Sequence, residues 1–228
     1  MKAVLVLLSS LALTGALGHT AWQLLAREAA VELRLRVAER LPDSGVDHAV
    51  TAVLLNFRSY DTLLEIGVLM VAGLAGLSMR AVAPMEAREL HTRDPLLRAL
   101  MRWFVPLLLV LAAYLLWAGS DRPGGAFQAG SVLGATGVLL RLGGVPLPFL
   151  RPGPMLRLGL VVGFAVFLLV AVMGAVRGDA FLAYPPAWAG GLILLIEAML
   201  TLSIAMVLVG LFAVAPAQPS AADRGEKP

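Results

Sequence analysis

Long apolar runs separated by short polar segments make up most of this chain. A window of about 19 residues, the length that crosses the core of a bilayer, selects about six such runs. They cover residues 3–18, 50–77, 103–119, 126–140, 158–176 and 188–212. The run at 126–140 is short for a full crossing unless its ends are buried in protein. In the run at 103–119, Pro106 is expected in the first turn of the helix. The pattern predicts an all-α, polytopic integral membrane protein with about six transmembrane helices.

The distribution of lysine and arginine among the connecting segments predicts the orientation. If the amino terminus is cytoplasmic, eleven basic residues lie on the inner side and six on the outer side, with Arg58 inside the membrane. Cytoplasmic loops carry the excess of basic residues, so both termini are predicted to be cytoplasmic. On the outer side, residues 22–41 are expected to form a short surface helix that Pro42 stops.

The composition excludes several classes of function. The chain is 59% hydrophobic and 14% charged, which is typical of a membrane protein. Its net charge of +3 does not indicate nucleic-acid binding, because the basic residues lie between apolar runs. It has no cysteine, and its three histidines, His19, His48 and His91, lie near span ends or in loops. We therefore expect no disulfide, no iron–sulfur cluster, no metal and no other cofactor.

A charged stretch in the run at 50–77 is the first candidate for function. Arg58, Asp61 and Glu65 fall at i, i+3 and i+7 on one helical face, with Thr62 near the same stripe. A charge at the centre of a span costs on the order of 3 kcal/mol, and such residues commonly mark an ion or proton path. A purely structural role is the alternative, but interhelical polar contacts contribute only about 0.6–2 kcal/mol. We therefore predict that this cluster belongs to an ion or proton path.

Glu197 is the other acidic residue within an apolar run. It has no basic residue near it in the sequence, and Thr201 lies one turn further on, where it could donate a hydrogen bond. We expect Glu197 to be protonated or paired with a group from another chain. A role in the proton path and a structural role both remain open.

A glycine-rich segment joins the runs at 103–119 and 126–140. Its sequence is Asp121-Arg122-Pro123-Gly124-Gly125-Ala126-Phe127-Gln128-Ala129-Gly130. It is not a phosphate-binding loop, because no Gly-Lys-Ser/Thr follows. Small residues recur every four positions, which predicts a face for close helix approach. Structural packing is favoured over ion binding, for which Asp121 and Gln128 are the plausible ligands. The residues predicted to serve the turn and the packing are Pro123, Gly124, Gly125, Phe127, Gln128, Gly130 and Gly134.

Two of these blocks resemble a known family. Residues 49–53, leading into Phe57-Arg58-Ser59-Tyr60-Asp61-Thr62-Leu63-Leu64-Glu65, resemble a segment of the multisubunit Mrp-type cation/proton antiporters and of the membrane-bound hydrogenases. The glycine-rich segment resembles the Pro-Gly-Gly-Gly-Phe-x-Gly-Gly motif of the B subunit of those antiporters. It departs from the motif at Ala126 and Ala129, where alanine is compatible only if neither position needs a positive φ.

The resemblance, which covers about residues 50–212, implies a division of the chain. Residues 1–83 resemble the small two-helix subunit of membrane-bound hydrogenases, and residues 98–215 resemble the four-helix B subunit. Residues 84–97 are expected to form a cytoplasmic linker, and 216–228 a disordered tail. In the small subunits the first helix is retained. We therefore expect residues 1–18 to remain, although Lys2 and the small residues at 16–18 would also fit a signal peptide.

By this resemblance the chain is expected to be a membrane subunit of an Na⁺/H⁺ antiporter complex in a bacterial or archaeal cytoplasmic membrane. Its partners would be other membrane subunits, the lipid bilayer, protons and Na⁺. It is not expected to transport alone, because it lacks the long chain with internally broken helices and midplane repeats of self-sufficient carriers. It is not expected to be an enzyme, because the sequence has no serine–histidine, paired-aspartate or His-Glu-x-x-His arrangement. The alternatives are a membrane-arm subunit of a redox-driven complex of the hydrogenase type and a structural membrane scaffold. Asp61→Ala or Glu65→Ala with full transport would favour the scaffold.

Overall fold

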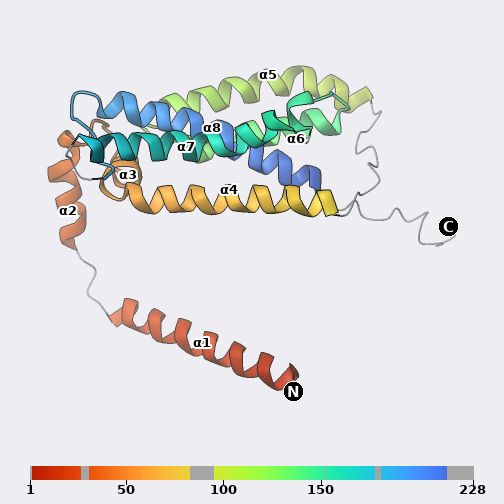
Figure 1. Cartoon of the computed structure of the whole chain (residues 1–228). Coiled ribbons are helices and arrows are strands. Elements are labelled where there is room, and N and C mark those ends of the chain that lie inside the picture. Colours follow the sequence, from red (N-terminus) through yellow and green to blue (C-terminus); the bar gives the residue numbers. More distant parts are fainter. Residues whose placement is uncertain (1, 27–30, 83–94, 152, 178–180, 215–228) are drawn as a thin grey trace. The chain divides into compact units, whose positions relative to one another are not determined.

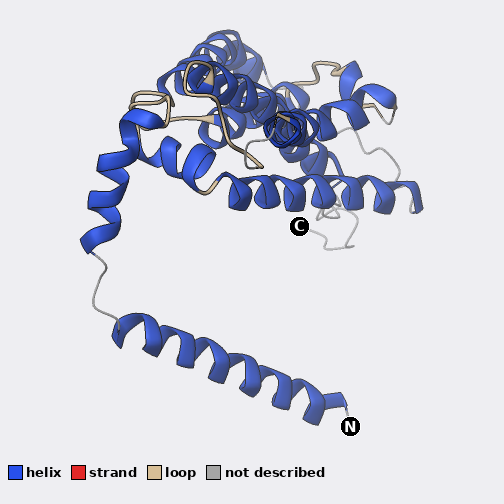
Figure 2. Ribbon diagram, turned by 60° about the vertical axis from the view of Figure 1, so that its left-hand side comes forward, coloured by secondary structure: helices blue, strands red, loops and turns tan. Residues whose placement is uncertain are grey.

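In the computed structural model the described residues are all those except 1, 27–30, 83–94, 152, 178–180 and 215–228. Throughout this part of the chain the secondary structure is helical, with no strand (Figure 2). The chain divides into two compact units, Met1–Glu39 and Arg40–Pro228. The expected linker lies mostly outside the described residues, and the expected tail lies entirely outside them.

The first unit contains helix α1 (Lys2–Ala26) and nearly all of helix α2 (Val31–Arg40). The apolar run at 3–18 lies within α1, which continues beyond it. The expected surface helix over 22–41 is therefore wrong at its start, because residues 22–26 belong to α1. Its end is close to the expectation: α2 stops at Arg40, and a 3₁₀ turn, η1 (Leu41–Asp43), contains Pro42.

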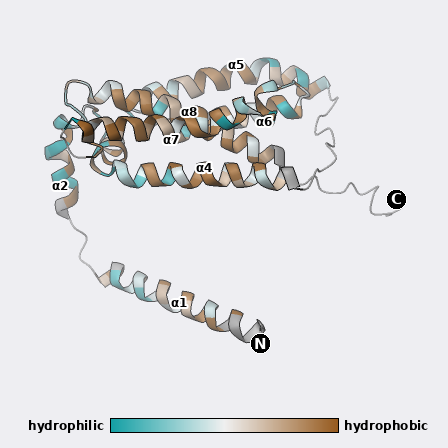
Figure 3. Ribbon diagram, in the orientation of Figure 1, coloured by the Kyte–Doolittle hydropathy of each residue, from teal (hydrophilic) through white to brown (hydrophobic). Residues whose placement is uncertain are grey.

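The second unit contains the remaining expected spans. Its helices are α3 (Ala49–Ala52), the π-helical η2 (Val53–Phe57), α4 (Ser59–Val82), α5 (Pro95–Ala118), α6 (Ala126–Leu142), the 3₁₀ turn η3 (Pro148–Leu150), α7 (Pro154–Val176) and α8 (Ala189–Val214). In the described residues, four segments are long and apolar enough to cross a membrane: Ser59–Met79, Pro95–Ala118, Pro154–Val176 and Ala189–Phe212. Apolar residues follow α5, α7 and α8 along their length (Figure 3). The prediction of an all-α, polytopic membrane protein is confirmed.

Helix α8 is the central helix of this unit. In the apolar segment of α8, 56% of the residues are buried, whereas in that of α5 only 11% are buried. It contacts α4, α5, α6 and α7 (Figure 1). Ile193, Ile196 and Leu200 of α8 are almost fully buried, together with Phe167 of α7. The helix that carries Glu197 is thus the one that the rest of the unit surrounds.

Glycines allow the neighbouring helices to approach α8 closely. A Cβ atom added at Gly130 of α6 would lie 2.8 Å from Cβ of Ile204, and one added at Gly134 would lie 3.2 Å from Cβ of Leu208. In membranes, where no hydrophobic force drives helices together, such close backbone packing is a main source of helix association.

Ser203 links α8 directly to the backbone of α7. Its hydroxyl donates a hydrogen bond to the Gly159 carbonyl oxygen and accepts one from the Gly163 N–H, each at 2.8 Å. These are the two backbone groups that an α-helix ordinarily pairs with each other. A side chain added at Gly163 would lie 2.9 Å from the Ser203 oxygen, so this glycine makes the contact possible.

The expected continuous span over 50–77 is wrong, because the helix is broken at Arg58. Arg58 has φ −127° and ψ 30°, and the regular helix α4 begins only at Ser59. Two polar side chains next to the break donate to backbone carbonyl oxygens earlier in the chain, one in η2 and one in the loop before α3. The Thr62 hydroxyl donates to the Leu54 carbonyl oxygen at 2.7 Å, and the Asn56 side-chain amide donates to the Ser44 carbonyl oxygen at 3.0 Å.

Pro106 also lies elsewhere than expected. Helix α5 begins at Pro95, so Pro106 is inside the helix and not in its first turn. The sequence indicated a later start, at Trp103, because Arg98 and Arg102 lower the mean hydropathy of the residues before it. Arginines at the end of a span are compatible with a helix, since their long side chains can reach the polar boundary.

Candidate functional site

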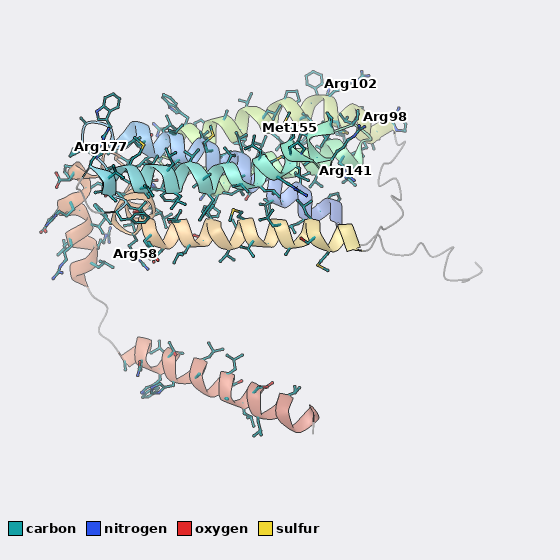
Figure 4. The ribbon with its side chains drawn as sticks, in the orientation of Figure 1. Arg58, Arg98, Arg102, Arg141, Met155 and Arg177 are labelled. Atoms are coloured by element: carbon teal, nitrogen blue, oxygen red, sulfur yellow. The ribbon has the colours of Figure 1, made fainter. Side chains whose placement is uncertain are left out.

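The charged cluster of the second apolar run lies at the surface of its unit. Arg58 and Asp61 form a salt bridge, and their side chains are 70% and 55% exposed. Figure 4 shows Arg58 at the same end of the unit as Arg177, and opposite the end with Arg98, Arg102 and Arg141. Arg58 directly precedes the apolar segment Ser59–Met79, so the break in the helix places it at the end of this segment and not in the middle of a span.

Asp61 and Glu65 lie in the first two turns of α4, and both are exposed. With a rise of 1.5 Å per residue, Glu65 lies roughly 9 Å along the helix from Ser59. Thr62 points the other way and is 3% exposed. The unit therefore separates Thr62 from the three charged residues with which the sequence grouped it.

Glu197, in contrast to the charged cluster, is buried inside the unit. Its residue is 4% exposed, and its carboxylate accepts a hydrogen bond from the backbone N–H of Ala126, the first residue of α6. The hydroxyl of Thr201 donates to the Glu197 backbone carbonyl oxygen at 2.8 Å, and not to the carboxylate. Glu197 thus supplies an acceptor to one of the N–H groups that a helix leaves unpaired at its amino terminus.

Two glycines make room for this carboxylate. A Cβ atom added at Gly125 would lie 2.6 Å from Oε1 of Glu197, and one added at Gly119 would lie 3.2 Å from Oε2. Gly125 also has φ 101°, a conformation that side chains rarely adopt. The glycine-rich segment and the buried acid, which the sequence presents as separate features, therefore form one site.

The remaining residues of the glycine-rich segment fix the turn from α5 into α6. Gly125 donates its N–H to the Leu115 carbonyl oxygen at 2.9 Å, and a side chain at Gly124 would overlap that same oxygen. Ala126 and Ala129 belong to α6, and neither has a positive φ. Alanine is therefore compatible with both positions at which the segment departs from the antiporter motif.

A small cavity, lined by apolar residues and four polar side chains, lies beside the Glu197 carboxylate. It has a volume of about 80 Å³, enough for two or three water molecules. Its polar side chains are those of Thr51, Thr62, Gln128 and Glu197. The residues of this cavity that the sequence singled out are Thr62, Gly124, Gly125, Phe127, Gln128 and Glu197. Pro123 lies in the turn before them, whereas Gly130 and Gly134 lie further along α6 against α8.

Thr51 and His48 are the polar residues of this site that the sequence reasoning missed. The Thr51 hydroxyl donates to the Gly119 carbonyl oxygen, and its oxygen lies 3.3 Å from Nδ1 of His48. The backbone N–H of His48 donates to the Ser120 carbonyl oxygen at 2.8 Å. The available signal was the spacing of His48 and Thr51 by three residues at the start of a helix, which brings two such side chains together.

Tyr184 lies outside the spans, in the segment between α7 and α8, with its hydroxyl oxygen buried near Ser59. Burial raises the pKa of Tyr184, an effect that the Ser59 hydroxyl partly offsets. Tyr184 therefore stays neutral around pH 7. As for metals, no group of three or more histidine, cysteine, aspartate or glutamate residues within the described ranges could hold one.

Comparison with known proteins matches the part of the chain that contains the glycine-rich segment and Glu197. Residues 96–215 match a family described as a domain related to the MnhB subunit of Na⁺/H⁺ antiporters. A protein from Rhizobium meliloti (strain 1021), named as a probable K⁺/H⁺ antiporter subunit of type A/B, is 28% identical over 127 residues, which cover 45% of this chain and 13% of that protein. The chain thus spans only a small part of the length of this relative.

Two solved structures share the fold. The structure of the Mrp complex from Dietzia sp. DQ12-45-1b matches 94% of this chain and 26% of its own, with a TM-score of 0.67 and 22% identity. A chain of the membrane-bound sulfane sulfur reductase, an archaeal respiratory membrane complex, matches with a TM-score of 0.68 and 21% identity, over 93% of this chain and 97% of its own. The family match covers more than half of the sequence, including the glycine-rich segment and Glu197. The chain therefore belongs to the family of membrane domains related to the MnhB subunit of Na⁺/H⁺ antiporters, as its resemblance to the Mrp-type B subunit predicted.

Proposed function

We propose that this chain is a membrane subunit of a multisubunit cation/proton antiporter, in which Glu197 and its cavity form part of the proton path. The observation that carries the proposal is a carboxylate that is buried in the central membrane-spanning helix and lines a cavity with three other polar side chains. Ionisable groups within spans are costly to keep and commonly serve ion or proton transfer. The family and the named relative support cation/proton exchange, and we propose Na⁺ as the cation.

The surroundings of Glu197 combine burial with one backbone hydrogen bond. The carboxylate accepts this bond from the Ala126 N–H at the amino-terminal end of α6. Within the described residues, no lysine or arginine lines the cavity to hold the carboxylate permanently ionised. Such a group can take up a proton and release it again.

The exposed face of α4 belongs, in this proposal, to the contact with a partner subunit. Asp61 and Glu65 lie among exposed apolar side chains, including Tyr60, Leu64 and Val68. Lipid would disfavour the carboxylates by about 3 kcal/mol each near the centre of a bilayer, and by less near its boundary. A neighbouring protein that offers polar or basic groups removes this cost. Arg58, Asp61 and Glu65 would then contribute to an ion path at the interface and not inside this chain.

The arginines indicate the orientation that we propose in a bacterial or archaeal cytoplasmic membrane. Arg98, Arg102 and Arg141 lie together at one end of the second unit (Figure 4). By the positive-inside rule this end faces the cytoplasm. The break at Arg58 and the start of α3 then lie near the outer side of the membrane.

The test uses the assembled complex in proteoliposomes, with proton movement followed after addition of Na⁺ or K⁺. Glu197→Gln is expected to lower exchange about 100-fold, the scale of losing a proton-transfer group, while the complex still assembles. Ser131→Ala, at an exposed position of α6, is the control and is expected to exchange at the wild-type rate. An assembled Glu197→Gln complex that exchanges at full rate would favour a purely structural role for this chain.

A redox-driven complex is the second candidate. It is favoured by the structural match to the archaeal respiratory complex, which covers 97% of the matched chain. Copurification of a soluble protein that holds metal clusters would decide for this candidate. The role of Glu197 in proton transfer would be the same in both complexes.

A further inference from the structure

The polar atoms beside Glu197 continue in one direction toward the surface of the unit. Thr51 is 5% exposed and lines the cavity that Glu197 also lines. His48 is half-buried, and its Nδ1 lies 3.3 Å from the Thr51 hydroxyl oxygen. His48 is the residue before α3, and its backbone N–H donates to the carbonyl oxygen of Ser120 in the turn between α5 and α6. Among the titratable groups near it, Asp47 and Asp121 are exposed, as is Arg122.

We propose that His48 and Thr51 form the entrance through which protons pass between the outer aqueous side and Glu197. This inference rests on the proposed role of Glu197 in proton transfer, and it assigns roles to two residues outside the matched range 96–215. The route consists of the His48 ring, the Thr51 hydroxyl, water in the cavity and the Glu197 carboxylate.

A proton that moves along this route protonates Glu197 and leaves the His48 ring in its other tautomer. A proton from water adds to Nε2 of His48, while the proton on Nδ1 passes to Oγ1 of Thr51. The Thr51 hydroxyl turns from the Gly119 carbonyl oxygen toward the cavity and passes its own proton to a water molecule, which gives one to Glu197. The imidazole ends as its other tautomer and returns by exchange with water.

A structural role alone does not account for the placement of His48. It is the residue that caps α3, yet its side chain makes no capping hydrogen bond to the helix backbone. Its ring instead faces a hydroxyl that is otherwise bonded only to the loop. Substitution of a histidine that merely caps a helix would change stability and not proton transfer.

The same site is a poor place for a metal cation. The amino-terminal end of α6 directs its N–H groups and the positive end of its dipole toward the Glu197 carboxylate. The Thr62 hydroxyl, which could otherwise serve as a ligand, is used to satisfy the Leu54 carbonyl oxygen. A proton that joins the carboxylate covalently does not need further ligands. The cavity therefore suits a proton better than Na⁺.

The experiment compares His48→Gln and Thr51→Val in the assembled, reconstituted complex. Each is expected to slow exchange about tenfold or more, since each removes a proton-transfer group. Thr136→Val is the matched control, because Thr136 is 1% exposed and its hydroxyl bonds within α6 to the Val132 carbonyl oxygen. Imidazole added on the outer side is expected to restore much of the rate in His48→Gln and none in Thr51→Val.

Each outcome decides between the two proposals. Wild-type exchange in both variants, together with slow exchange in Glu197→Gln, would overturn the entrance and leave the role of Glu197 intact. Wild-type exchange in Glu197→Gln would overturn the proposed function itself. If Thr51→Val does not assemble, the His48→Gln complex decides alone: slow exchange that imidazole does not restore would count against the entrance.

Discussion

At the residue scale, the position of Glu197 depends on the glycines around it. Gly125 combines a positive φ with a Cβ position 2.6 Å from a carboxylate oxygen, so two separate effects exclude a side chain there. At Gly119 a side chain is excluded because its Cβ atom would lie 2.7 Å from Cα of Gly125 and 3.2 Å from the other carboxylate oxygen. The glycines thus serve the buried acid as well as the turn.

Gly125→Ala is expected to destabilise the protein by about 2–6 kcal/mol, the sum of a strained backbone and an overpacked contact. The measurement is the thermal unfolding midpoint of the purified complex. Gly210→Ala is the matched control, because a Cβ atom at this helical position meets no other atom within 4 Å. The control should unfold at or slightly above the wild-type temperature, and equal midpoints for the two variants would contradict the prediction.

At the element scale, the positions of α6 and α7 against α8 are set by small residues. The sequence predicted the small-residue repeat on α6, because a repeat of four residues along one helix is a local pattern. It did not predict which helix this face would meet, since nothing in the repeat names Ile204 or Leu208. The break at Arg58 was not predicted either, since the hydrogen bonds of Thr62 and Asn56 beside it join residues eight and twelve positions apart in the chain.

Gly130→Val is expected to push α6 away from α8, because the added carbons would overlap Ile204 and the Thr201 carbonyl oxygen. Overpacking of this kind costs about 1–3 kcal/mol. The readout is the thermal midpoint of the complex together with the fraction that assembles. Ala135→Val adds volume at an exposed position of the same helix and should leave both quantities close to wild type.

The apolar spans and the fold class could be predicted because apolar length is a local property of the sequence. The site could be predicted only in its parts. Glu197 and the glycine-rich segment were both recognised, but about 70 residues separate them, and only the packing of α6 on α8 brings them together. The exposed position of Arg58 could not be predicted, because an unbroken helix fits the local pattern equally well.

At the scale of the whole molecule, much of the apolar surface of the second unit is not covered by its own helices. Only 11% of the apolar segment of α5 and 28% of that of α4 are buried. Lipid can cover the apolar side chains of α5, but it is a poor neighbour for Asp61 and Glu65 on α4. The charged side is therefore where a partner protein is expected.

Glu65→Cys tests this partner contact, and the chain has no cysteine of its own to interfere. A maleimide should label the purified single chain in detergent and should label the assembled complex at least about fivefold more slowly, since a buried thiol is much less accessible to the reagent. The cysteine-free parent chain gives the background. Equal labelling in both states would show that this face of α4 remains open in the complex.

Ser203 joins α7 and α8 by hydrogen bonds to the α7 backbone. Because its oxygen holds both ends of one backbone pair of α7, a sliding displacement of α8 must either break these two hydrogen bonds or carry α7 along at that level. A movement that begins where Glu197 changes its charge would consequently be transmitted to the adjacent span within two turns, through directional bonds instead of through interchangeable apolar contacts.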